Sequence, residues 1–259
     1  MGKYLTLERL GQSAILTINN PPANLWTVDS LNELAHTMAE LDADRSYRSV
    51  VITGAGEAFF SAGADLKQFL TGDKTAALQV LDAFAAAFGA IRRYRGVTVA
   101  AINGYALGGG LEGALACDYI VAERGAQLGL PEAKVGLLPG GGGTKLLADK
   151  VGIAWAKRMI LGGEIILAEK AYEIGLVEEL VDPGFAKIVA VSLANKVVNQ
   201  APNAVAEARR LIEESAQLSL SEHLQRERAA LVSLIGEPEQ MEGVAAFMGK
   251  RTPKWAEES

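Results

Sequence analysis

VTVAAINGYALGGGLEGALACDYIVAE, residues 97–123, contains two apolar runs separated by a glycine-rich segment and a short helical segment. The runs VTVAAI (97–102) and DYIVA (118–122) are short and contain β-branched residues, as is typical of strands buried on both faces of a parallel sheet. A third run of this kind, SVVIT, occupies residues 49–53. We therefore interpret this part of the chain as the centre of a buried sheet.

Helical segments alternate with these strands. Residues 28–41 carry apolar residues at helical spacing, and so do residues 74–94. Two further strands are expected at residues 3–9 and 14–18, joined by a turn at Gly11. Strands that alternate with helices along the chain predict an α/β fold with a mostly parallel sheet.

The strand signals stop after Asp182. Beyond it, helical spacing extends over residues 183–200, 202–218, 219–235 and 238–249. We therefore divide the chain into a sheet-containing core, residues 1–200, and a helical C-terminal region, residues 201–259.

Composition and charge exclude several classes of protein. Of the 259 residues, 49% are hydrophobic and 22% are charged, so the chain can bury a large core. The net charge is −6, whereas nucleic-acid binders usually carry a basic patch, so no nucleic acid is expected as a partner. A single cysteine cannot form an internal disulfide bond, and two histidines disfavour a His-rich metal site. No bound metal is expected.

Targeting signals are weak. No apolar stretch approaches about 18 residues, so no membrane-spanning helix is expected. The N-terminal segment MGKYLTLERL has charges where a signal peptide would have its apolar region. Gly2 and Thr6 fit the loose N-myristoylation pattern, but the alternation of KYLTLERL favours a strand. We expect a soluble, cytoplasmic protein that does not contact a membrane.

Glycine is concentrated in one segment, since residues 101–143 hold 12 of the chain's 28 glycines. Glycine lets a backbone approach a ligand closely with its N–H groups exposed. We therefore expect main-chain atoms, more than side chains, to form a site in this segment.

Two glycine patterns resemble nucleotide-binding motifs but fit them poorly. Gly108, Gly110 and Gly113 match G-x-G-x-x-G, yet residues 104–107 separate them from the preceding strand, and the helix that follows lasts only about two turns. In PGGGGTK (139–145) the lysine follows the threonine, which is the wrong order for a phosphate loop. Nucleotide binding, and with it a nicotinamide oxidoreductase, is therefore disfavoured.

Two carboxylates lie inside the glycine-rich segment. Glu112 follows the glycine triplet, and Glu132 lies 20 residues later with the strand 118–122 between them. One strand and its return could bring both to the same end of the sheet, where a pair of acids can activate water and deliver a proton. The alternative is structural: Glu112 as a helix N-terminal acid and Glu132 as a first-turn acid after Pro131.

A second glycine-bearing stretch, FFSAGADLKQF (59–69), follows the strand at 49–53. Asp65 before LKQF is typical of a helix cap. The backbone N–H of Ala64 could point at a ligand from the same helix start.

Together these segments resemble the crotonases, the enoyl-CoA hydratase/isomerase superfamily. The resemblance covers nearly the whole chain, and within the superfamily both acids stand at the hydratase positions. Its motifs are SAGADLKQF (61–69), AAINGYALGGGLEGALACDYIVAE (100–123), AQLGLPEAKVGLLPGGGGTKLLADKVG (126–152), AEKAYEIGLVEELV (168–181) and AFMGKRTPKW (246–255).

The resemblance implies a spiral of ββα repeats with a helical C-terminal trimerisation region, assembled as a homotrimer or as a homohexamer made of two trimers. The N–H groups of Ala64 and Gly109 would form an oxyanion hole for a thioester carbonyl. Glu112 and Glu132 would hold a water molecule and exchange its proton, and Gly140 would orient that water.

The resemblance also implies an acyl-CoA thioester as the substrate, with CoA as part of it and no separate cofactor. Ala62, Asp65 and Leu66 match CoA-binding positions. Phe247 and Lys250 match C-terminal residues that contact the nucleotide end of CoA, and whether they do so across a subunit boundary is left open.

The expected reaction is the addition of water across the double bond of a trans-2-enoyl-CoA. The alternatives within the superfamily are an isomerase, a decarboxylase or an acyl-CoA dehydratase, and outside it a non-catalytic CoA- or RNA-binding relative. Lys145 and Leu146 replace a more usual Gln-Arg pair, and Gly113 replaces a larger residue. These departures bear on acyl-chain preference and local packing, and they remove no catalytic group.

Overall fold

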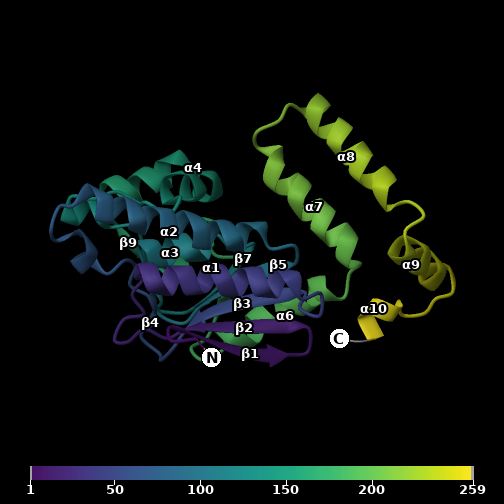
Figure 1. Ribbon diagram of the computed structural model, residues 1–259, viewed down its shortest axis with the longest axis horizontal. Helices are drawn as coiled ribbons and strands as arrows, with labels where there is room; N and C mark the ends of the chain where they lie inside the picture. Colours follow the sequence, from purple (N-terminus) through teal and green to yellow (C-terminus); the bar gives the residue numbers. More distant parts are fainter. Residues whose placement is uncertain (1, 258–259) are drawn as a thin grey trace.

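The computed structural model describes residues 2–257 and contains two β-sheets with helices packed on them (Figure 1). Within these residues the larger sheet has six strands in the order β1-β2-β3-β5-β7-β10. β1 pairs antiparallel with β2, and all the later neighbours pair parallel, which confirms the expected mostly parallel sheet. In this order, the strands are Leu5–Leu10, Ser13–Ile18, Ser49–Gly54, Val97–Ile102, Tyr119–Glu123 and Glu179–Val181.

A smaller sheet has the order β4-β6-β8-β9. Its members are Phe59–Ser61, Tyr105–Leu107, Gln127–Gly129 and Ile165–Leu167. Each is three residues long, which is too short to show an alternating pattern. The hydrophobic pattern alone therefore did not indicate this sheet.

The two sheets are linked by a repeated unit. In β3-β4-α2, β5-β6-α3 and β7-β8-α4, the first strand joins the large sheet, the second joins the small sheet and a helix follows. The three helices are α2 (Lys74–Arg93), α3 (Gly109–Leu115) and α4 (Gly143–Leu161). This arrangement is the ββα spiral expected from the resemblance.

The central strands of the large sheet are buried on both faces, whereas the edge strand β1 is mostly exposed. The alternation of side chains along the central strands decides what each face contacts. Ile15, Val51 and Val99 point to the face covered by α6 (Ala186–Val198). Their neighbours Leu16 and Ile52 point to the opposite face, where α1 (Val28–Ala43), α2 and α3 pack. Burial on both sides explains why these strands read as continuous apolar runs.

Four helices follow the core: α7 (Pro202–Ser215), α8 (Leu220–Leu234), α9 (Pro238–Met248) and α10 (Lys254–Glu257). α7 and α8 extend away from the two sheets (Figure 1). This agrees with the expected helical C-terminal region, and the boundary at residue 200 remains our interpretation of the sequence. Two short 3₁₀ helices, η1 (Leu66–Phe69) and η2 (Glu132–Val135), and the helix α5 (Ala168–Glu173) complete the core.

Among the described residues, α2 is the one helix whose length and composition would allow it to cross a membrane. One face of α2, which includes Val80, Phe84, Phe88 and Ile91, is buried in the core. A core helix of this kind passes such a test, so the result is weak evidence for a membrane span.

Candidate active site

A cavity of about 1050 Å³ lies among α2, the start of α3, η1, η2 and the segment that precedes α4. Its wall is mostly apolar and includes Leu81, Phe84 and Leu137. Glu112 and Glu132 both line it. The structure therefore brings the two predicted acids into one cavity, and its apolar wall is suited to an alkyl chain.

Glu112 is held by the backbone that leads into α4. It lies in α3, and only 2% of it is exposed. Its Oε1 accepts hydrogen bonds from the N–H groups of Gly141 at 2.7 Å and Gly143 at 2.8 Å. Burial raises the pKa of this carboxyl, and the N–H donors oppose that rise because they favour the charged form. Gly143 is the first residue of α4, so the dipole of that helix also favours the anion.

Glu132 lies in a different environment. It opens η2 after Pro131, and its Oε2 is buried without a hydrogen-bond partner in the described structure. Burial raises its pKa to about 7, and the negative charge of Glu112 adds to the rise. The two acids therefore lie in different environments, because Glu112 accepts from two amides that precede and begin α4, whereas one carboxyl oxygen of Glu132 has no partner.

Two amides face the same cavity. Trp26 forms backbone hydrogen bonds with Gly63 and Asp65, on either side of Ala64. Gly109 begins α3, where helix N–H groups have no partner within the helix. Among the described residues, neither Ala64 nor Gly109 donates its amide to a backbone or side-chain acceptor.

The segments that carry these amides meet backbone to backbone. An ideal Cβ on Gly63, which has φ +93°, would lie 3.1 Å from the Gly109 nitrogen and 2.7 Å from the Leu107 oxygen. Gly108, with φ +52°, makes the turn from β6 into α3. A side chain at Gly63 would therefore push the two amides apart.

The other predicted positions in the core also line the cavity: Gly140, Ala62, Asp65 and Leu66. The Asp65 side chain accepts a hydrogen bond from the N–H of Lys67 at 3.0 Å, which confirms the expected helix cap. The cap fixes the start of η1 next to Ala64. Sequence reasoning missed the amides of Gly141 and Gly143 as partners of Glu112, although the run of four glycines at 140–143 is the signal that could have shown them.

Known proteins resemble this chain over nearly its full length. The sequence profile of the enoyl-CoA hydratase/isomerase family matches residues 11–258. The 2,3-dehydroadipyl-CoA hydratase of Escherichia coli K12 is 36% identical over 250 residues, which cover 96% of this chain and 97% of the relative. The short-chain-enoyl-CoA hydratase of Clostridium acetobutylicum is 35% identical over 246 residues, which cover 95% and 94%. The chain belongs to the enoyl-CoA hydratase/isomerase family.

Solved structures agree with this assignment. DspI from Pseudomonas aeruginosa superposes with a TM-score of 0.95 at 50% identity, covering 98% of this chain and 97% of that one. The enoyl-CoA hydratase from Bacillus anthracis superposes with a TM-score of 0.93 at 33% identity, covering 97% and 98%. The protein therefore has the crotonase fold and is an enzyme of the crotonase type.

Two residues predicted from the crotonase resemblance lie away from the cavity of their own chain. Phe247 is at the end of α9 and is 83% exposed, and Lys250 follows it. Neither is among the described residues that line the cavity. The structure therefore places neither residue beside the cavity of its own chain, and a contact with CoA across a subunit boundary stays a prediction.

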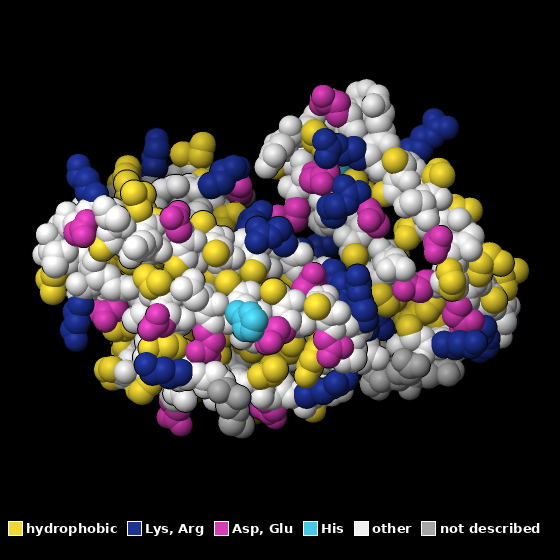
Figure 2. All heavy atoms as spheres, in the orientation of Figure 1, with side chains coloured by type: hydrophobic (Ala, Val, Ile, Leu, Met, Phe, Trp, Pro, Cys, Tyr) yellow, Lys and Arg dark blue, Asp and Glu magenta, His cyan; other side chains and the backbone are white. Residues whose placement is uncertain are grey.

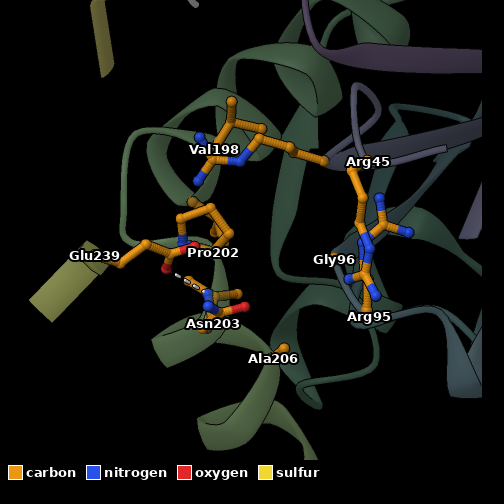
Figure 3. Close-up of a pocket in the computed structure, with 11 residues that line it drawn as sticks. Arg45, Arg95, Gly96, Val198, Pro202, Asn203, Ala206 and Glu239 are labelled. Atoms are coloured by element: carbon orange, nitrogen blue, oxygen red, sulfur yellow. Dashed lines mark hydrogen bonds between the residues drawn. The ribbon is translucent and has the colours of Figure 1, made fainter. Parts of the chain in front are cut away.

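A second cavity, about 370 Å³, lies where the crotonase core meets the start of α7 (Figure 3). Arg95 lines it and donates to the carbonyl of Tyr47 at 2.9 Å, while Arg48 donates to the carbonyl of Trp255 at 3.2 Å. The described residues that line this cavity include a single carboxylate, Glu239. Arg48 therefore links the core to the C-terminal region, Arg95 binds within the core, and the described lining of this cavity has no pair of acids.

Proposed function

We propose that this protein adds water across the double bond of a trans-2-enoyl-CoA thioester. The observation that carries the proposal is the presence, in one largely apolar cavity, of two unlike glutamates and two amides without an acceptor. Relatives with hydratase names, one of them a short-chain-enoyl-CoA hydratase, support the same reaction.

The amides of Ala64 and Gly109 would bind the thioester carbonyl. When water attacks the β-carbon, negative charge moves to the carbonyl oxygen, and two N–H donors stabilise that charge. Loss of one such donor typically lowers the rate by about 10²–10³-fold. The backbone contact at Gly63 keeps these donors in place before the substrate arrives.

Glu112 would act as the base and Glu132 as the acid. Hydrogen bonds from Gly141 and Gly143 favour the anion of Glu112, which accepts a proton from the attacking water. The Oε2 of Glu132 has no hydrogen-bond partner and burial raises the pKa of this carboxyl to about 7, so it can hold a proton near neutral pH and give it to the α-carbon. Gly140 would orient the water.

The rest of the substrate would extend from this centre. Ala62, Asp65 and Leu66 line the cavity beside the oxyanion hole and would contact CoA. No cofactor other than the CoA of the substrate is proposed. Phe247 and Lys250 would reach the nucleotide end of CoA in a neighbouring subunit.

A homotrimer or a homohexamer would place the C-terminal helices against other subunits. Several large apolar side chains on α8 and α9 are exposed, among them Leu231, Val232, Val244 and Phe247. Figure 2 shows hydrophobic side chains gathered on the side of the molecule formed by these helices. Burial of such a surface by another copy of the chain would remove it from water.

The direct test is a panel of enoyl-CoA thioesters of different chain length, followed by the loss of absorbance of the conjugated double bond. Hydration should appear with at least one member, and Glu112→Gln and Glu132→Gln should each abolish most of it. Isomerisation of a 3-enoyl-CoA without hydration of any 2-enoyl-CoA would contradict the proposal. Equilibrium sedimentation of the same sample measures the assembly.

A further inference from the structure

One face of α2 contacts four glycines of the active site, at positions 109, 113, 140 and 141. Leu81, Phe84 and Phe88 are spaced i, i+3, i+7 and therefore share a face. An ideal Cβ on Gly140 would lie 2.5 Å from the Leu81 side chain, and one on Gly109 would lie 2.9 Å from the Phe84 ring. The Phe84 ring therefore leaves no room for a side chain at Gly109, whereas the partly exposed Leu81 side chain is flexible and limits Gly140 less.

Phe88 lies between the two segments that hold Glu112. Its ring would be 3.1 Å from a Cβ on Gly113, which follows Glu112 in α3. The opposite side of the ring would be 2.8 Å from a Cβ on Gly141, whose N–H donates to Glu112. The ring thus sets the separation between α3 and the glycine run at 140–143.

The ring itself is fixed by its neighbours. Phe88 is 2% exposed. Its centroid lies 5.2 Å from that of Phe84 and 6.2 Å from that of Trp26, which meets it edge to face. Among the described residues Phe84 lines the cavity and Phe88 does not, so Phe88 can act on the substrate only through other residues.

We propose that Phe88 is a positioning residue for Glu112, because its ring holds Gly141 at the distance from α3 that lets the Gly141 and Gly143 amides bind the carboxylate. The proposal rests on the proposed function for the role of Glu112 toward water, but the contact itself does not depend on it. The absence of a side chain at Gly113 is then explained, because the ring occupies that space. Among the described residues, Glu132 is a titratable group that shares the cavity with Glu112, and burial together with the charge of Glu112 raises the pKa of Glu132.

The first test compares Phe88→Leu with Ile91→Val, one turn further along the same buried face of α2. A smaller side chain should let the glycine run move and weaken the N–H bonds to Glu112. We expect kcat to fall about 10- to 100-fold. Because a weaker hydrogen bond favours the Glu112 anion less, the pKa of this carboxyl should rise, and the acidic limb of the pH profile should move up by about one pH unit. Ile91→Val should change thermal stability without moving that limb. Phe88→Met replaces Phe88→Leu if the latter does not fold.

The second test uses the space beside Gly113. Gly113→Ala alone should lower kcat, because its methyl group would press on the ring. In the Phe88→Leu background the same methyl group fills the vacated space, so Gly113→Ala should raise kcat and return the acidic limb toward the wild-type value. An equal effect of Gly113→Ala in both backgrounds, or an unmoved limb in Phe88→Leu, would overturn the proposal.

A readout without turnover separates this proposal from the proposed function. The carboxyl band of Glu112, identified in infrared difference spectra against Glu112→Gln, can be titrated in the wild-type protein and in Phe88→Leu. Its midpoint should rise in Phe88→Leu even if no enoyl-CoA proves to be a substrate. An unchanged midpoint would contradict the positioning role whether or not the enzyme is a hydratase.

Discussion

The carboxylate of Glu112 accepts a 2.8 Å hydrogen bond from the amide of Gly143, so an acid in α3 is joined to the first residue of α4. The same oxygen accepts from Gly141. A buried carboxylate with two main-chain donors can keep its charge in an apolar cavity. This bond therefore links the fold, which places the two helix starts together, to the protonation state on which the proposed chemistry depends.

Glu112→Gln tests the base directly. The amide oxygen of glutamine can still accept from Gly141 and Gly143, so the cavity should keep its shape while proton acceptance from water is lost. We expect the hydration rate to fall by about 10²–10⁴-fold, with little change in the thermal midpoint. Loss of enoyl-CoA absorbance gives the rate, and a variant as active as wild type would exclude Glu112 as the base.

Glu132 should control the alkaline side of the pH profile. Its pKa is raised to about 7, so the proposed acid loses its proton as the pH rises through that value. We expect the hydration rate to decline above about pH 7, as measured in buffers of constant ionic strength. A rate that stays constant well above pH 7 would contradict the assignment of Glu132 as the acid.

The same shift affects stability. Burial raises the pKa of Glu132 in the folded state, so the folded protein holds this proton more tightly than the unfolded chain does. The resulting contribution to the free energy of unfolding is fully present below the ordinary pKa of 4.5 and is lost as the pH rises through about 7. Glu132→Gln removes that ionisation and should raise the melting temperature relative to wild type more at pH 8 than at pH 5. Glu227→Gln, at an exposed position of α8, should show no such trend. If Glu132→Gln changed the melting temperature by the same amount at pH 5 and at pH 8, as Glu227→Gln should, the result would count against a buried, neutral Glu132.

The oxyanion hole can be tested with a pair of substitutions at Gly109. Gly109→Ala and Gly109→Pro both add a Cβ that meets the Phe84 ring, but only proline removes the N–H. Proline is tolerated at the first position of a helix, and Gly109 is the first residue of α3. The ratio of kcat/KM between the alanine and proline variants should be about 10²–10³. Equal values would show that this amide does not bind the carbonyl.

The sequence predicted the large sheet well, because burial on both faces leaves a continuous apolar run in each central strand, as in residues 49–53 and 97–102. It did not predict the small sheet from pattern, because strands of three residues such as Tyr105–Leu107 are shorter than one clear alternation. The ββα spiral was expected only from the resemblance to a family.

For the candidate site, too, the sequence predicted some features and not others. The sequence indicated a backbone-built site from the glycines at 101–143, and the unengaged amide of Gly109 agrees with that idea. It could not show that Gly113 and Gly141 leave room for the ring of Phe88. That contact joins residues of α2 to segments that follow it much later in the chain, and no local pattern records it.

Asp118 is an acid that joins parts of the fold and lies outside the candidate active site. Its Oδ2 accepts from the amide of Thr98 at 2.7 Å, and its Oδ1 pairs with Arg209 of α7 at 2.8 Å. The two side chains of the pair are 13% and 16% exposed. The pair is therefore shielded from water and ties the C-terminal helices to the large sheet.

Arg209→Met should consequently destabilise the protein while leaving the active site intact. Removal of one partner from a fully buried ion pair costs about 3–5 kcal/mol, and the partial exposure of this pair reduces the expected loss to about 2 kcal/mol. Arg210→Met is the matched control, because Arg210 pairs with Glu207 and Glu214 on the surface and such pairs contribute about 0–1 kcal/mol. Urea denaturation at one protein concentration gives both values, since any assembly would add to the measured stability. If the two variants lose the same amount, the Asp118–Arg209 pair is no more important than a surface contact, and the C-terminal helices are held to the core by other contacts.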